Sequence, residues 1–121
     1  MAGAISYDVV GSEVLEPSPK GTVAFEGESY GSEVSMYLMV YREVGDGPDL
    51  HKHPYAETWV VREGKAQFTV GEDVFEAGSG SILVGPAEVP HMFKNLGPGN
   101  LDIICIHPSS RFIQVDLPSD E

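Results

Sequence analysis

Three of the four histidines in this chain and one glutamate have the spacing of a metal site. His51 and His53 lie two residues apart, so an extended strand sends both imidazoles to the same face. Glu57 follows four residues later, and Pro54 favours a bend or a strand edge between them. His91 lies much further along the chain. If its strand lies beside the first, three imidazoles and one carboxylate converge.

Such a set of side chains suits a divalent ion of the first transition row. Neutral imidazoles bind borderline metals well, and one carboxylate cancels part of the double charge. Four protein ligands leave positions open in an octahedral shell, where water, substrate or dioxygen can bind. Ligand type alone does not select the ion, so iron, manganese, nickel, copper and zinc are all candidates. The alternative interpretation is that these histidines are core residues whose hydrogen bonds are satisfied within the protein.

The elements that must position these residues are strands. Short runs rich in Val, Ile, Tyr, Phe and Thr alternate with Gly and Pro turns, a pattern that predicts an all-β sandwich or barrel. Between 62 and 65 we expect a hairpin whose Gly64 takes a positive φ. Further tight turns are expected at 71–73, 77–80 and 97–100. The predicted strands are residues 21–26, 33–43, 56–62, 65–70, 73–76, 81–84, 90–95, 101–107 and 111–115.

The size of the chain, 121 residues, predicts one domain. Residues 1–20 are expected to form an N-terminal arm and 21–121 a single barrel. The lone Cys105 permits no internal disulfide and favours a reducing compartment. The N-terminus lacks a basic stretch followed by an apolar run, and charges and glycines interrupt every apolar segment. We therefore expect a soluble, cytoplasmic protein.

Charge and patterning narrow the possible partners. The formal net charge of -12 disfavours nucleic acid and anionic membranes, which both attract basic proteins. Apolar residues occupy both faces of the segment 34–41 and of the segment 103–106. One face can line the barrel interior, but the other also needs cover. This pattern predicts a homodimer.

The two histidine-containing segments resemble the two sequence motifs of the cupin superfamily. The first motif is a Gly, five residues, His-x-His, three residues, Glu, six residues and a Gly, and Gly45–Gly64 matches every fixed position. The second motif is matched at Gly80, Pro86, His91 and Asn95. Glu88 is a departure from this motif, since the family usually has Gly there. Because that position normally serves a turn, the change concerns backbone shape more than metal binding.

The resemblance implies a fold and a ligand set. The fold is a double-stranded β-helix, or jelly-roll, barrel of the cupin type. The implied ligands of a divalent transition metal are His51, His53, Glu57 and His91. The resemblance also allows Glu57 to leave the metal and serve as a catalytic base.

Candidate pocket residues follow from strand parity, with an alternative for each. Trp59 and Val61 share the face of the glutamate if their strand is regular, so they line the cavity or pack in the core. Met36 and Leu38 are expected to line the barrel. His107 is either a residue beside the metal and substrate or a partly exposed residue at a strand end.

Function is less determined than the site, because the same barrel supports many reactions. The leading hypothesis is a metal-dependent enzyme, a dioxygenase or a related oxidoreductase, acting on a small, flat or modestly polar molecule with one chelating end. The alternative is a non-enzymatic module that senses a small molecule or the metal itself. A purely structural protein is the third reading.

Overall fold

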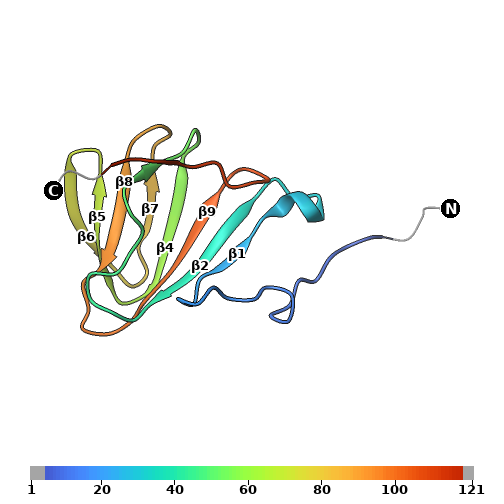
Figure 1. Cartoon of the computed structure of the whole chain (residues 1–121), viewed down its shortest axis with the longest axis horizontal. Coiled ribbons are helices and arrows are strands. Elements are labelled where there is room, and N and C mark those ends of the chain that lie inside the picture. The colour runs from blue at the N-terminus through green and yellow to red at the C-terminus, as the bar shows by residue number, and fades with distance from the viewer. Residues whose placement is uncertain (1–4, 119–121) are drawn as a thin grey trace.

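Two five-stranded antiparallel sheets make up the fold of this chain (Figure 1). The computed structural model describes residues 5–118. The first sheet, in spatial order, contains β1 (Val23–Phe25), β2 (Ser35–Tyr41), β9 (Leu101–His107), β4 (Glu57–Glu63) and β7 (Ile82–Gly85). The second contains β10 (Val115–Asp116), β3 (His51–Lys52), β8 (His91–Asn95), β5 (Lys65–Val70) and β6 (Asp73–Gly78). A short 3-10 helix, η1 (Gly27–Tyr30), follows β1. The predicted all-β, jelly-roll class is confirmed.

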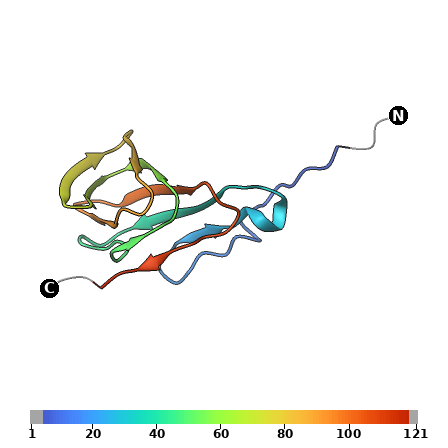
Figure 2. The same ribbon diagram turned by 90° about the horizontal axis from the view of Figure 1, so that it is seen from above.

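The first described residues project away from the sheets, and the chain then turns at residues 12–15 before it reaches β1 (Figure 2). No strand occurs between residues 5 and 22. The predicted arm, 1–20, and the predicted domain, 21–121, both reach into the ends that lie outside the described residues. That division of the chain stays a prediction. Among residues 5–118, no helix is long and apolar enough to cross a membrane.

Most consecutive strands lie in different sheets, and this corrects the expectation of a hairpin at residues 62–65. Gly64 has the predicted positive φ of 89°. The strands that it joins, β4 and β5, lie in different sheets, so the turn is a crossing and not a hairpin. The turns at 77–80 and 97–100 cross between the sheets in the same way, whereas 71–73 closes a true hairpin in which Val70 pairs with Asp73. These crossings close the two sheets around a common interior.

Two predicted elements differ from the structure. Strand β3 is absent from the predicted strands, although the His-x-His spacing was interpreted on an extended strand; it pairs with β10 on one side and β8 on the other. The strand expected at 111–115 is irregular until Val115. There the amides of Phe112 and Ile113 are bonded to side chains, the Glu26 carboxylate and the Tyr55 hydroxyl, instead of to a neighbouring strand.

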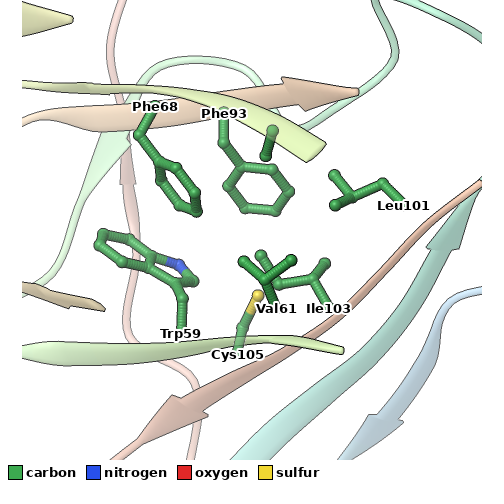
Figure 3. Close-up of a cluster of buried hydrophobic side chains, with 8 residues drawn as sticks. Trp59, Val61, Phe68, Phe93, Leu101, Ile103 and Cys105 are labelled. Atoms are coloured by element: carbon green, nitrogen blue, oxygen red, sulfur yellow. The ribbon is translucent and has the colours of Figure 1, made fainter. Parts of the chain in front are cut away.

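The hydrophobic core occupies part of the space between the sheets (Figure 3). Trp59 and Val61 project from β4 towards Phe68 of β5 and Phe93 of β8. The indole fits tightly, because a Cβ added at Gly85 would lie 2.4 Å from its ring. Burial of each large apolar side chain contributes about 1.5–3 kcal/mol. The core residues are Trp59, Val61, Ala66, Phe68, Phe93, Leu101, Ile103 and Cys105.

We predict that Gly64→Ala destabilises the protein by about 1–3 kcal/mol, whereas Gly99→Ala has little effect. A Cβ at Gly64 would lie 2.2 Å from the Asn100 carbonyl oxygen, on a backbone with positive φ. A Cβ at Gly99 meets nothing within 4 Å. Urea unfolding of both variants measures the difference. Equal stability of the two variants would show that the crossing tolerates a side chain.

Candidate metal centre

The four side chains singled out by their spacing meet at one buried point. His51 begins β3 and His91 begins β8, and the two are direct register partners. His53 follows β3, and Glu57 is the first residue of β4 in the opposite sheet. Each of the four offers one ligand atom, and these atoms all lie within 4.8 Å of one another. All four side chains are buried. The convergence therefore depends on the pairing of β3 with β8.

Hydrogen bonds at the outer side of two rings set their tautomers. His51 Nδ1 lies 2.6 Å from the Asp49 carbonyl oxygen, and His53 Nδ1 lies 2.7 Å from that of Ile113. A carbonyl oxygen only accepts, so each Nδ1 carries a hydrogen, and in the neutral ring each Nε2 keeps its lone pair. Backbone carbonyls that hold the outer nitrogen in this way are typical of metal-binding histidines.

The inner atoms of the cluster lack hydrogen-bond donors. Glu57 Oε1 lies 3.1 Å from His53 Nε2 and 2.9 Å from His91 Nε2. These three atoms are buried, and none has a hydrogen-bond partner of good geometry. Buried acceptors without donors are costly, and a cation at their centre would satisfy them together. Three imidazoles and one carboxylate are the donors that a divalent transition metal prefers, so the residues fit such an ion.

The ionisation of the cluster also favours a cation. Burial on its own would raise the pKa of Glu57, but the contacts with His107, His53 and His91 hold that pKa well below its usual range. Burial lowers the pKa of His51, which keeps its imidazole neutral. Burial also disfavours charge on His53, yet its contacts with Glu57 and a backbone carbonyl outweigh burial and raise its pKa. The centre thus holds a permanent carboxylate that attracts positive charge.

His107 lies beside the cluster and is 1% exposed, which excludes the alternative of a partly exposed strand end. Its Nε2 lies 3.1 Å from Glu57 Oε2, and its Nδ1 lies 2.6 Å from the Tyr55 hydroxyl. The sequence had left both positions of His107 open, and the structure places it inward, as it does Cys105 of the same strand. Tyr55 was missed, because it follows Pro54 outside any strand and no periodicity marks it.

A cavity of about 230 Å³ opens next to the cluster. Burial raises the pKa of the Cys105 thiol, so Cys105 faces the cavity as a neutral thiol and not as a metal-binding thiolate. The lining residues are Tyr37, Met39, Pro48, His51, Glu57, Phe93, Cys105, His107 and Gln114.

Four predicted pocket residues lie elsewhere. Met36 and Leu38 were expected to line the barrel, but Tyr37 and Met39 line the cavity instead. Successive side chains of β2 alternate, so Met36 and Leu38 point to the outer face of the first sheet. Because both faces of this strand carry apolar residues, the sequence did not show which face points inward. The other two, Trp59 and Val61, belong to the core and not to the cavity wall.

Glu88, which departs from the glycine of the second motif, keeps the backbone shape that a glycine would allow. Its φ is 65°, a left-handed conformation that is uncommon for a residue with a side chain. Its amide donates to the His53 carbonyl oxygen at 2.8 Å, and its carboxylate lies 3.3 Å from Lys52 Nζ. The turn therefore still braces the segment that carries His53.

A two-layered β-barrel with a buried cluster of three histidines and one glutamate defines a class of metal-site protein, and the comparisons identify the family. The family model described as "Cupin domain" matches residues 37–107, more than half of the chain. The chain belongs to the cupin family. The match contains all four residues of the cluster and ends at His107.

One sequence relative and several solved structures are similar to this chain, and the structures agree on the fold. An uncharacterized protein of Methanocaldococcus jannaschii is 33% identical over 63 residues, which are 51% of this chain and 50% of that protein. A structure of Bacillus subtilis oxalate decarboxylase, described for its Mn(II) centres, has a TM-score of 0.73 at 22% identity. A mutant of the same enzyme has a TM-score of 0.72 at 20% identity. Both comparisons cover 85% of this chain and 29% of the decarboxylase. The chain thus spans half of the curated relative and under a third of the decarboxylase.

We expect Glu57 to steepen the acid sensitivity of the metal-free protein. Its folded pKa lies far below the ordinary 4.5, so its stabilising contribution is present above pH 4.5 and is lost as the pH falls towards the folded pKa. Between pH 4.5 and the folded pKa, this one group removes up to about 1.4 kcal/mol per pH unit as the pH falls.

Urea unfolding of the wild type and of Glu57→Gln, from neutral pH to about pH 3, measures this contribution. The variant should lose stability less steeply than the wild type. Glu63→Gln changes an exposed carboxylate and serves as the matched control, with the wild-type slope. One common slope for all three proteins would contradict the role of Glu57.

Proposed function

We propose that this cupin is a metal-dependent enzyme that acts on a small organic molecule, as a dioxygenase or a related oxidoreductase. The observation that carries the proposal is the opening of the buried three-histidine, one-glutamate cluster onto a cavity. His51, His53, Glu57 and His91 would hold the ion. A bound divalent metal supplies Lewis acidity and, if it is redox-active, electrons for dioxygen. Because the structures of similar fold include one described for Mn(II) centres, manganese is tested first, together with iron.

The chain's own residues would bind and orient the substrate. Tyr37, Met39 and Phe93 give the cavity apolar walls next to the cluster, and these walls exclude water from the reacting end. Gln114, an exposed residue of the lining, supplies an amide whose oxygen can accept a hydrogen bond, while its nitrogen donates to Asp116 at 2.6 Å. A catalytic role for Glu57 as a base stays a prediction. The contacts that hold its pKa low oppose that role for as long as they persist.

Size and charge restrict the substrate. The cavity of about 230 Å³ is smaller than the roughly 300–1,000 Å³ of sites for drug-sized ligands. Neither lysine nor arginine lines it within the described part of the chain. A second carboxylate on the substrate would therefore be buried without a partner, which is costly. We infer a neutral or singly charged substrate with one chelating end, which disfavours the dianion oxalate.

Oxygen uptake by untagged protein loaded with iron or manganese tests the enzymatic proposal. We expect one metal per chain and uptake with at least one of a panel of catechols, enols and flavonols, but none with oxalate. His91→Ala should lose metal and reduce uptake by more than the roughly 10–100-fold that follows the loss of a residue behind a ligand. Glu63→Gln is the matched control and should behave like the wild type.

Two outcomes of this experiment would contradict the proposal in different ways. Absence of metal, with no measurable affinity for iron, manganese, nickel, copper or zinc, would remove the metal centre. One metal per chain with no uptake above that of free metal would favour the non-enzymatic binding module instead.

We also propose that the chain forms a homodimer through the outer face of its first sheet. Leu38, Ile104, Val60 and Ile82 are register partners across four neighbouring strands, so they form one apolar row. None of the four is fully buried, and Ile82 is 69% exposed. A second copy with two-fold symmetry would cover the same row on both subunits.

Sedimentation velocity tests this dimer. Ile82→Glu places two like charges in the proposed interface and should weaken association at least about tenfold. Val74→Glu introduces the same charge on β6 of the other sheet, at a side chain that is 59% exposed, and should leave association unchanged. A monomeric wild type, or equal association of the two variants, would contradict the proposed interface.

A further inference from the structure

A chain of short contacts runs from the backbone to the outer oxygen of Glu57. The Ile113 amide donates to the Tyr55 hydroxyl oxygen at 3.2 Å. The same hydroxyl lies 2.6 Å from His107 Nδ1, and His107 Nε2 lies 3.1 Å from Glu57 Oε2. His107 is buried, with its ring packed edge-on against Phe112 at 5.0 Å between centroids. The contacts with Tyr55 and Phe112 hold His107 in place, and neither residue belongs to the cluster.

The direction of these hydrogen bonds determines the tautomer of His107. The Ile113 amide can only donate to the Tyr55 oxygen, so His107 Nδ1 is the one acceptor among these two partners for the hydroxyl hydrogen, and we take the hydroxyl as its donor. Nδ1 is then an acceptor, and the neutral ring carries its hydrogen on Nε2, the atom that faces Glu57 Oε2. The arrangement is the reverse of that in His51 and His53, whose Nε2 atoms keep lone pairs.

The backbone of one residue, Ile113, contacts both kinds of histidine, directly or through Tyr55. The Ile113 carbonyl accepts from His53 Nδ1, and the Ile113 amide acts on His107 through Tyr55. The Tyr55 ring also stacks on His53, with 5.2 Å between centroids and 4° between the planes. His53, whose neutral ring offers a lone pair, and His107, whose ring offers a hydrogen, are therefore both held by Tyr55 and the Ile113 backbone.

We propose that Tyr55 and His107 are positioning residues for Glu57. His107 Nε2 lies 3.1 Å from Oε2, without the angle of a well-formed hydrogen bond, and its hydrogen would draw that oxygen towards His107. Only Oε1, which lies between His53 and His91, is then directed at the ion. The same tautomer excludes His107 as a fifth ligand, because a nitrogen that carries hydrogen has no lone pair for a metal. The inference rests on the proposed metal-binding role of Glu57.

Nitrogen-15 NMR of the imidazoles in the metal-free protein tests the tautomers directly. In the neutral state we expect hydrogen on Nε2 of His107 and on Nδ1 of His51 and His53. Tyr55→Phe removes the hydroxyl but keeps the ring, so the preference of His107 for Nε2–H should be lost. Hydrogen on Nδ1 of His107 in the wild type would overturn the proposal.

Manganese affinity and the Mn(II) electron paramagnetic resonance spectrum test the positioning role. Tyr55→Phe and His107→Leu should each weaken Mn(II) binding about 10–100-fold, the usual effect of losing a residue that orients a ligand, and should alter the spectrum. His107→Gln keeps an N–H donor and should restore much of the affinity. Tyr30→Phe on η1, where Tyr30 stacks on Phe25, is the matched control.

The two proposals fail in different ways. If the wild type binds Mn(II) and both Tyr55→Phe and His107→Leu bind it equally well with the same spectrum, the positioning role is wrong and the metal centre stands. If the wild type binds no metal, the proposed function fails, and the positioning role fails with it. Thermal unfolding of each variant, with Tyr55→Phe as the smallest change, separates a lost contact from a lost fold.

Discussion

A carboxylate buried among four imidazoles is the constraint on which the rest of this structure depends. An isolated buried charge is strongly unfavourable, so Glu57 can be buried only where nitrogen atoms approach both of its oxygens. The cavity wall and the crossings between the sheets surround that group. Four of its neighbours come from three different elements, and each is placed by a main-chain contact or a strand register. The fold therefore positions the groups around one buried carboxylate as well as burying apolar side chains.

The interior has an apolar part, which stabilises the fold, and a polar part, which forms the candidate metal centre. Aromatic and aliphatic side chains such as Trp59 and Phe68 fill one part and exclude water from it. The polar part lies beside them, and the Trp59 ring meets the His91 ring edge-on at 4.8 Å. Phe93 belongs to both parts, as a core residue and as a cavity wall. The rigid core thus fixes one histidine directly, while a second, His53, depends on the irregular segment near the C-terminus.

The site was easier to anticipate from the sequence than the strands that build it. The His-x-His spacing, Glu57 and His91 form a distinctive pattern, and the structure brings these side chains together. The His-x-His spacing indicated an extended strand there, but β3 was missing from the predicted strands because a two-residue element has no period to detect. The lining of the cavity was misjudged at β2, where Met36 and Tyr37 are both apolar enough to face inward, and only pairing with β9 decides between them.

Contacts that depend on tertiary structure lay beyond sequence reasoning altogether. Tyr55 lies in a bend, and its partner His107 is 52 residues away. No local rule joins two such positions, since their approach follows from the closing of the barrel. The turn at Glu88 shows the opposite case, because a departure from the family pattern left the backbone shape unchanged.

Ile113 acts on the metal centre through its backbone and not through its side chain. Its carbonyl and amide orient two histidines, while its side chain is 44% exposed and contributes to neither contact. Most amino acids could occupy the position without disturbing either bond, and proline, which has no amide hydrogen, is the exception. Position 113 could therefore vary freely between related sequences, and its importance would be visible only in the main chain.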